Sequence, residues 1–236
     1  MQFLASLLFT TYLFVSTGVF AVAVVLSGVF PYPVRHAVAS SWAGSALWML
    51  KVLCRLNYSV EGRENIPAGN HISMWKHSSS WETMAQMIVF PPQAWVLKHE
   101  LLWIPILGWA IWLMRPIAID RGSGHVAVKE VQEQGRQRLA AGMWILIFPE
   151  GTRMAPGTTR KYGLSGALLA TQTGKLVVPV AHNAGRYWPR RGLLKKRGTI
   201  RVVIGQPFDP TGLEPRELNE RVQEWIESTV ARLERE

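Results

Sequence analysis

Two short strings about 70 residues apart contain side chains that can do chemistry together. In residues 76–82 (KHSSSWE), His77 stands five positions before Glu82, and a histidine oriented by an acid can act as a general base toward a hydroxyl. Residues 148–153 (FPEGTR) end an apolar run with an acidic, glycine-containing loop, and the guanidinium of Arg153 can bind phosphate oxygens. Behind an apolar N-terminus, the two strings predict a hydroxyl nucleophile on a phosphorylated lipid.

The spacing of His77 and Glu82 is a weak signal by itself, because His125 is followed at the same distance by Glu130. Five residues of helix turn through about 500°, so such side chains meet only when the histidine precedes the helix and the acid lies in its first turn. His77 meets this condition, since the serines at 78–80 are favourable helix-capping residues. We expect Glu130 to be a solvated surface residue. The alternative for the first pair is a histidine that caps a helix beside an unrelated surface acid.

The FPEGTR loop follows a continuous apolar run, 144–148, which is typical of a buried strand. The proline after this run stops the strand. Gly151 allows the backbone to approach a ligand closely, and Thr152 and Arg153 supply hydrogen-bond donors. Binding sites in α/β sheets gather at the carboxyl ends of strands, where this loop is expected to lie. The alternative is an ordinary tight turn in which Glu150 pairs with Arg153.

Strand-like and helix-like patterns alternate from residue 57 onward, which predicts an α/β fold. We expect a single domain, residues 57–236, with a central mixed, largely parallel sheet flanked by helices. Residues 1–56 are expected to form an N-terminal membrane anchor and an interfacial helix. The expected strands cover 58–61, 94–97, 116–120, 144–148, 176–180 and 199–205, and the expected helices cover 124–142 and, at the C-terminus, 218–233.

The first 30 residues are apolar and long enough to cross a hydrocarbon core of about 30 Å as a helix. A secretory signal peptide would carry a basic segment before a shorter apolar stretch, so we expect a retained anchor that ends at Pro31 and Pro33. The next apolar run, 36–56, predicts a helix at the membrane interface; a second crossing, which would give a helical hairpin, is the alternative. Basic residues that follow the anchor, beginning with Arg35, predict that the body of the protein faces the cytosol, at the inner (plasma) membrane in a bacterium.

The formal net charge of +10 resides outside the apolar N-terminus. Residues 186–201 contain seven basic residues and no acid. This run suits an anionic membrane face better than nucleic acid, because few aromatic residues for base stacking accompany it. The single cysteine, Cys54, excludes an intramolecular disulfide framework and a cysteine-rich metal site. No pair of histidines has metal-ligand spacing with a nearby acid, so we expect no metal site. Because the basic run suits a membrane face better than nucleic acid, we expect no nucleic-acid partner.

Four motifs in the same order make the chain similar to the glycerophospholipid acyltransferase family, typified by 1-acylglycerol-3-phosphate (lysophosphatidic acid) acyltransferase. The family's histidine–acid block corresponds to His77 and Glu82, although the family usually has aspartate at the second position. Its second block corresponds to residues 108–121, its third matches 148–153 at every position, and its hydrophobic–proline block corresponds to 178–180. The resemblance therefore covers most of the chain beyond the apolar N-terminus.

The resemblance implies membrane-bound transfer of a fatty acyl group from acyl-CoA or acyl-ACP (acyl carrier protein) to the sn-2 hydroxyl of lysophosphatidic acid. The product would be phosphatidic acid, which makes the reaction a step of phospholipid biosynthesis. His77 would remove the hydroxyl proton and Glu82 would orient the imidazole, with no cofactor beyond the acyl-donor substrate. A backbone N–H in the first turn after His77 is the candidate oxyanion donor. The expected partners are membrane lipids, the lysophospholipid acceptor and the thioester donor.

The resemblance also implies a substrate-binding set of six residues. Two arginines would bind the phosphate, since the planar guanidinium matches its oxygens. Residues of the FPEGTR loop would shape the phosphate pocket, and a lysine after the expected strand 94–97 is either a substrate contact or an ordinary surface residue. The set is Lys98, Arg121, Glu150, Gly151, Thr152 and Arg153.

Two alternative functions stay open at this point. The first keeps the chemistry but changes the acceptor to another lyso-lipid or to glycerol-3-phosphate, because the motifs specify the reaction better than the acceptor. The second is a non-enzymatic, basic membrane-surface binding protein, in which His77 would be dispensable.

Overall fold

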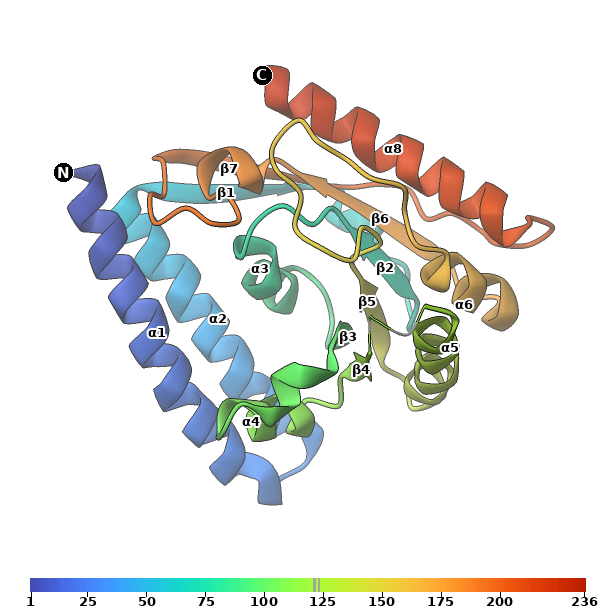
Figure 1. Cartoon of the computed structure of the whole chain (residues 1–236), viewed down its shortest axis with the longest axis horizontal. Helices are drawn as coiled ribbons and strands as arrows, with labels where there is room; N and C mark the ends of the chain where they lie inside the picture. Colours follow the sequence, from blue (N-terminus) through green and yellow to red (C-terminus); the bar gives the residue numbers. More distant parts are fainter. Residues whose placement is uncertain (121, 123) are drawn as a thin grey trace.

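A seven-stranded sheet lies between two layers of helices in the computed structural model, which describes residues 1–120, 122 and 124–236 (Figure 1). The strand order is β1-β7-β6-β2-β5-β3-β4, and every neighbouring pair is parallel except β6 and β7. This confirms the mixed, largely parallel sheet. The strands are β1 (Leu56–Glu61), β2 (Ile72–Trp75), β3 (Gln93–Lys98), β4 (Ile117–Ile119), β5 (Trp144–Ile147), β6 (Val177–His182) and β7 (Gly198–Ile204). The helices are α1 (Gln2–Leu26), α2 (Tyr32–Cys54), α3 (Trp81–Val89), α4 (Leu107–Leu113), α5 (His125–Ala140), α6 (Ser165–Thr173), α7 (Ala184–Tyr187) and α8 (Pro215–Arg235), with 3-10 helices η1 (Ser27–Val29), η2 (Arg63–Asn65) and η3 (His99–Trp103).

β2 is the strand that the sequence patterns do not predict, whereas each expected strand is present with its ends displaced by no more than two residues. It has four residues, all buried in the middle of the sheet. Ser73 interrupts its apolar run, which conceals the strand pattern in the sequence. Inside the sheet Ser73 Oγ donates to Gln93 Oε1 at 2.5 Å, so the buried hydroxyl has a partner.

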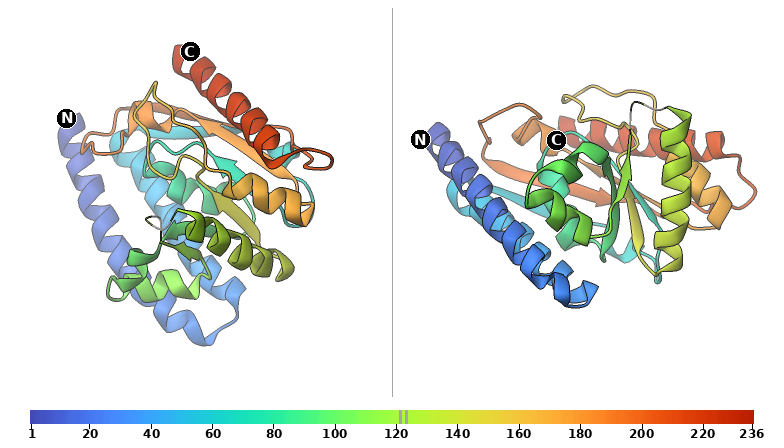
Figure 2. Two further views of the ribbon diagram at one scale, coloured as in Figure 1. Left: turned by 45° about the vertical axis from the view of Figure 1, so that its right-hand side comes forward. Right: turned by 60° about the horizontal axis from the view of Figure 1, so that its bottom comes forward.

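Two apolar cores cover the two faces of the sheet. Alternate strand residues point to opposite faces, so Trp75 packs with the N-terminal helices while Met74 packs with the opposite layer. The first core contains residues of α1, α2 and α3, and the second contains residues of α5, α6 and α8. Figure 2 shows the same arrangement from two directions, with the sheet between the N-terminal helices and the α5–α6–α8 layer.

The apolar N-terminus forms a helical hairpin of α1 and α2, and the choice between an interfacial helix and a second crossing for α2 stays a prediction. Pro31 precedes α2 and a second proline lies in its first turn, which accounts for the sharp reversal after η1. Both helices are long and apolar enough to cross a membrane. α2 is also a core helix, because Ala43, Ala46 and Leu50 are fully buried in the first core. The expected division of the chain at residue 56 stays a prediction, since hairpin and sheet share this core.

Lys195 fastens the beginning of α1 to the basic segment before β7. Its backbone N–H donates to Ser6 Oγ (2.9 Å), and its ammonium donates to Thr10 Oγ1. The ammonium also lies 5.4 Å from the ring centroid of Phe9 and 5.0 Å from that of Trp188. This lysine belongs to the run expected to face anionic headgroups, yet it is buried and joins two parts of the fold.

Side chains of α5 cap the open edge of β4. Gln134 Nε2 donates to Ala118 O (3.1 Å), and Arg138 donates to two carbonyls just before the strand (2.9 and 3.4 Å). Glu130 Oε2 accepts the N–H of Asp120 (3.2 Å). The three side chains follow one another at intervals of four along the helix, so they face the strand together. Glu130 is therefore an edge-capping residue rather than the purely solvated one expected, and the capping satisfies backbone groups that would otherwise pair with another strand.

Candidate active site

The carboxyl ends of parallel strands bring the sequence motifs to one edge of the sheet. β2 leads into His77, β5 leads into the FPEGTR loop, and β3 ends at Lys98. β6 runs parallel to β2 and ends at His182. Because β2 lies between β5 and β6, the His77 segment stands between the FPEGTR loop and His182.

His77 and Glu82 form a hydrogen-bonded pair. Glu82 lies in the first turn of α3, and its Oε1 accepts a hydrogen bond from His77 Nδ1 at 2.8 Å. The proton on Nδ1 leaves Nε2 as the nitrogen that can accept a proton. The imidazole also stacks on Phe148, with ring centroids 4.0 Å apart and an interplanar angle of 18°. The pair therefore has both the tautomer and the orientation that a general base needs.

Glu82 also organises the turn before α3. The same Oε1 accepts the backbone N–H groups of Ser78 (3.0 Å) and Ser79 (2.8 Å). Burial alone would raise the pKa of Glu82, but the hydrogen bond from His77, the nearby histidines and the Ser79 N–H hold that pKa below its usual value. Glu82 is thus ionised beside His77. The Ser78 and Ser79 N–H groups thus already have an acceptor, and the oxyanion donor expected in this turn stays a prediction.

His182 is a buried histidine that the sequence patterns do not single out. Its Nε2 donates to the carbonyl oxygen of Lys76 (2.8 Å) and lies 3.9 Å from Glu82 Oε2. Its Nδ1 accepts the N–H of Ala184 (3.3 Å). Burial lowers the pKa of His182, and one donor with one acceptor engaged describes a neutral imidazole. The ring holds the residue before His77 in place.

Glu150 is buried and bonded to the His77 segment. Its Oε2 accepts the His77 backbone N–H (2.7 Å), and its Oε1 lies 2.7 Å from Lys76 Nζ. Burial raises the pKa of Glu150 to about 7, although Lys76 acts in the opposite direction. The alternative in which Glu150 pairs with Arg153 is wrong in the described part of the chain, where Lys76 is its ion-pair partner. Its side chain is 0% exposed, so this placement favours a positioning role over the substrate contact expected from the resemblance.

Lys76 connects the site to the C-terminal helix. Its ammonium donates to both carboxylate oxygens of Glu227 on α8, at 2.8 and 3.0 Å. Glu227 also accepts the hydroxyl of Tyr162 (2.6 Å). The buried ammonium of Lys76 thus forms ion pairs with two carboxylates, those of Glu150 and Glu227. The charge of Glu227 contributes to the raised pKa of Glu150.

The rest of the FPEGTR loop is tied to the His77 segment. The N–H of Met154 donates to His77 O at 2.7 Å. Gly151 has a φ of +68°, a left-handed conformation that favours glycine. Thr152 and Arg153 are half-buried, and Arg153 Nε has no hydrogen-bonding partner among the described residues. The guanidinium is therefore available for an anionic ligand.

Two residues of the expected substrate-binding set remain: Lys98, which the structure describes, and Arg121, which it does not. Lys98 is exposed at the end of β3 and pairs with Glu100 (2.5 Å). It shares the edge of the sheet with the other motifs, but its ammonium already has a carboxylate partner. Arg121 lies outside the described residues.

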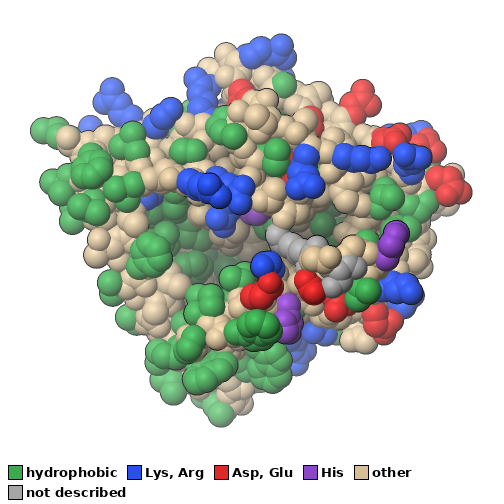
Figure 3. All heavy atoms as spheres, viewed as in Figure 1, with side chains coloured by type: hydrophobic (Ala, Val, Ile, Leu, Met, Phe, Trp, Pro, Cys, Tyr) green, Lys and Arg blue, Asp and Glu red, His purple; other side chains and the backbone are tan. Residues whose placement is uncertain are grey.

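An apolar groove of about 430 Å³ begins beside the turn that holds His77 and Glu82. Its walls come from α1, the beginning of α3 (Ser80 and Thr83 among them) and residues 105–107. A narrower apolar cavity of about 100 Å³ shares Thr17, Ala21 and other lining residues with the groove and continues between the hairpin, α3 and α4. Figure 3 shows the face that contains this region, hollowed at its centre, with lysine and arginine side chains above the hollow and apolar side chains toward α1 and α4.

Comparison with known proteins identifies the family. A family model described as Acyltransferase matches residues 57–183, more than half of the chain. The chain belongs to this acyltransferase family. The match runs from β1 to the end of β6, so it includes the strands and the helix from which His77, Glu82 and Glu150 extend.

Curated relatives of this acyltransferase agree with the assignment. The chain is 42% identical over 212 residues to the 1-acyl-sn-glycerol-3-phosphate acyltransferase of Pseudomonas aeruginosa, covering 88% of this chain and 82% of that protein. It is 27% identical over 169 residues to the human 1-acyl-sn-glycerol-3-phosphate acyltransferase alpha, covering 70% and 60%. Its fold matches the crystal structure of the LPA acyltransferase PlsC from Thermotoga maritima with a TM-score of 0.80 at 24% identity, over 99% and 98% of the two chains.

The residues of this acyltransferase that sequence patterns missed share one property. His182, Lys76, Glu227 and Tyr162 all act through partners that are distant in sequence, on another strand, loop or helix. The sequence offers two signals for these residues. Lys76 is adjacent to His77, and His182 is the last residue of the strand that contains the hydrophobic–proline motif. Nothing in the sequence marks Glu227 among the other acids of α8.

Proposed function

We propose that this acyltransferase moves a fatty acyl group from acyl-CoA or acyl-ACP to the sn-2 hydroxyl of 1-acylglycerol-3-phosphate, giving phosphatidic acid. The observation that carries the proposal is the His77–Glu82 hydrogen bond at 2.8 Å, which makes Nε2 the basic nitrogen beside an apolar groove. The relatives named for this acceptor support the choice of substrate.

His77 takes part in both proton transfers of the proposed reaction. His77 Nε2 takes the proton of the acceptor hydroxyl. At the same time the hydroxyl oxygen attacks the thioester carbonyl carbon and forms the new C–O bond. Collapse of the tetrahedral intermediate breaks the C–S bond, and the imidazolium returns the proton to the departing thiolate. Glu82 stabilises the imidazolium between these steps, and a positioned base of this kind contributes about 10²–10⁴-fold to the rate. Protons and bonds in the proposed step balance with the base, the carboxylate and the two substrates alone, so the proposal includes no cofactor or metal.

The acceptor phosphate is assigned to the FPEGTR loop. Arg153 is half-buried, its Nε lacks a partner among the described residues, and it belongs to a loop whose next residue donates its backbone N–H to His77 O. Arg121 is the second proposed phosphate ligand on the strength of the sequence motif. The glycine at 151 and the threonine at 152 shape the loop around the guanidinium.

The acyl chain is assigned to the apolar groove and its narrow extension. Both are lined by residues of α1, so the hairpin supplies one wall of the proposed acyl site. A membrane location follows from the same helices, which combine spanning length with exposed apolar residues such as Phe14 and Val19. Arg35 and the basic residues that follow the apolar N-terminus support a catalytic domain that faces the cytosol.

A panel of acceptors tests the proposal. Purified full-length protein in vesicles is given labelled acyl-CoA or acyl-ACP with lysophosphatidic acid, glycerol-3-phosphate or a lyso-aminolipid. We expect the highest kcat/KM with lysophosphatidic acid, a loss of about 10²–10⁴-fold in His77→Ala, and near-wild-type turnover in the matched control His125→Ala. A preference for another acceptor would move the proposal to that substrate. Absence of transfer to every acceptor, or full activity of His77→Ala, would refute it.

A further inference from the structure

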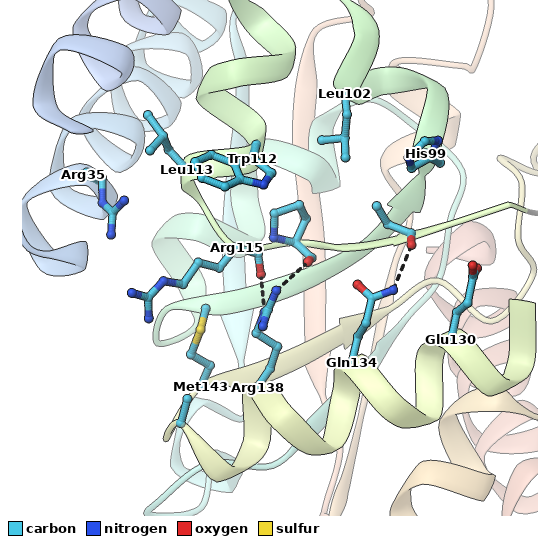
Figure 4. Close-up of a pocket in the computed structure, with 13 residues that line it drawn as sticks. Arg35, His99, Leu102, Trp112, Leu113, Arg115, Glu130, Gln134, Arg138 and Met143 are labelled. Atoms are coloured by element: carbon cyan, nitrogen blue, oxygen red, sulfur yellow. Dashed lines mark hydrogen bonds between the residues drawn. The ribbon is translucent and has the colours of Figure 1, made fainter. Parts of the chain in front are cut away.

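A cavity of about 640 Å³ lies outside the site described above, between α5, α4, the beginning of α2 and the edge strand β4 (Figure 4). Three arginines line it: Arg35 from α2, Arg115 before β4, and Arg138 from α5. Arg115 and Arg138 stand at the amino end of β4, whereas His77 follows the carboxyl end of β2, and the two strands run in the same direction. The arginine cluster and the His77–Glu82 pair are therefore at opposite ends of the sheet.

The positive charge of this cluster is not neutralised within the described residues. None of its three arginines forms an ion pair with a described carboxylate. Arg35 and Arg115 instead lie against the ring of Tyr32, with guanidinium carbons 5.9 and 5.7 Å from its centroid. Like charges held together without a counter-ion are unfavourable, and the fold nevertheless brings the beginning of α2, the residue before β4 and the end of α5 to one cavity.

Two polar atoms inside the cluster lack partners. Arg35 Nε and the hydroxyl of Tyr32 are buried and have no hydrogen bond among the described residues. The guanidinium of Arg138 is partly engaged, because it caps the backbone before β4. Figure 4 shows Arg35 and Arg115 extending on the same side of the cavity, away from the Gln134 and Glu130 end. Unpaired donors on two guanidinium groups match the oxygens of a phosphate.

The opposite wall of the cavity is apolar and continues onto an exposed apolar surface. Leu102, Trp112 and Leu113 line the cavity. Trp112 is 67% exposed, and its neighbours on η3 and α4, Trp103 and Trp109, are also exposed. Exposed tryptophans beside arginines are typical of the level where lipid headgroups meet the hydrocarbon. The cavity thus combines an anion-binding end with an apolar wall.

We propose that Arg35, Arg115 and Arg138 form a binding site for the phosphate group of an anionic phospholipid, separate from the acyl-transfer site. The phosphate accepts hydrogen bonds from the Arg35 and Arg115 guanidinium groups, which both line the cavity. The glycerol and the upper acyl chain lie along Trp112 and Leu113. The site anchors the helical hairpin and the sheet domain to one lipid molecule.

Ligand binding by full-length protein in a neutral maltoside detergent tests this site. The probe is dihexanoylphosphatidylglycerol, which is neither substrate nor product of the proposed reaction, and the readout is the ligand-dependent shift in Tm, which gives an apparent Kd. We expect the Kd to weaken about tenfold or more in the double variant Arg35→Gln/Arg115→Gln. The matched control Arg216→Gln/Arg221→Gln removes the same charge from the exposed face of α8 and should bind as wild type does.

A second double variant, Arg35→Lys/Arg115→Lys, retains the positive charge. It still tests the site if the double variant with glutamine does not fold. It should bind with intermediate affinity, because an ammonium lacks the planar fork of arginine. Wild-type affinity in both cluster variants, or equal weakening in the α8 control, would overturn the site. A parallel titration with inorganic phosphate separates the two sources of this chemistry. An equal, variant-sensitive response to phosphate alone would overturn the lipid assignment in favour of a free phosphate.

Discussion

The carboxylate of Glu150 and the backbone N–H of His77 are joined by a hydrogen bond of 2.7 Å. The two residues are 73 positions apart, and each belongs to a different sequence motif. The acid of the FPEGTR loop therefore holds the base-carrying segment, and the same carboxylate pairs with Lys76. This relationship makes the two motifs one unit rather than two independent halves of a substrate pocket.

Glu150→Gln separates a positioning role from substrate binding. The amide retains an acceptor for the His77 N–H but removes the charge that pairs with Lys76, so kcat should fall by about tenfold, the effect of losing roughly 1.4 kcal/mol of positioning. KM for the acceptor should change little. Steady-state kinetics with the acceptor varied give both constants. A rise in KM at unchanged kcat would instead show that Glu150 contacts the substrate.

The raised pKa of Glu150 predicts a pH-dependent stability. Its pKa of about 7 in the folded protein exceeds the ordinary carboxyl value of 4.5, so the folded state binds more protons than the unfolded state between these values. The free energy of unfolding therefore declines as pH rises through that window. In Glu150→Gln this decline should be smaller, by up to roughly 3 kcal/mol between pH 4.5 and pH 8. Unfolding of both proteins at several pH values measures the difference. Parallel curves for wild type and variant would contradict the raised pKa.

Glu82→Gln removes the charge that stabilises the His77 imidazolium. The three donors on Glu82 Oε1 remain within reach of the amide oxygen, so the fold should persist while kcat falls by about 10²-fold or more. Glu82→Asp restores a carboxylate one methylene shorter and should retain more activity than the amide. The expected order of kcat is wild type, Asp, then Gln. Wild-type rates for Glu82→Gln at neutral pH would mean that Glu82 acts only as a helix-capping residue.

Arg153→Ala should raise KM for the phosphorylated acceptor more than KM for the thioester donor. The substitution removes a charge-assisted interaction of about 1.5–3 kcal/mol, which corresponds to roughly 10–100-fold in kcat/KM for the acceptor. Arg160→Ala is the control, because Arg160 is an exposed arginine in the loop that follows. Equal changes in KM for both substrates would indicate that Arg153 supports the loop rather than the phosphate.

Ala21→Trp should shorten the acyl chains that the protein accepts. Ala21 lines both the groove and its narrow extension and is 5% exposed, so the indole would fill the deeper cavity of about 100 Å³. Competition among acyl donors of increasing length measures the preference, and Val19→Trp on the exposed side of α1 is the matched control. An unchanged length preference in Ala21→Trp would place the acyl chain elsewhere.

Sequence alone determined the features that depend on neighbouring residues. His77 precedes a helix and Glu82 lies in its first turn, and this local geometry brings the two side chains together. The contact depends on five neighbouring residues and not on distant parts of the chain. The strand-then-loop character of residues 144–153 and the two apolar N-terminal helices follow in the same way from local composition, whereas their packing as a hairpin does not. β2 escaped prediction because four residues with a serine among them carry no clear period, although the strand is central.

Tertiary structure decided which distant groups surround the base. The order β6-β2-β5 places His182 on one side of His77 and Glu150 on the other, and no local pattern encodes the order of strands. The pairing of Lys76 with Glu227 spans 151 positions and depends on how α8 packs against β6 and α6. The arginine cluster likewise exists only because the fold brings one residue each from the beginning of α2, the segment before β4 and the end of α5 to one cavity. Long-range packing of apolar faces sets these contacts, since buried polar groups find partners only after the core that encloses them has formed.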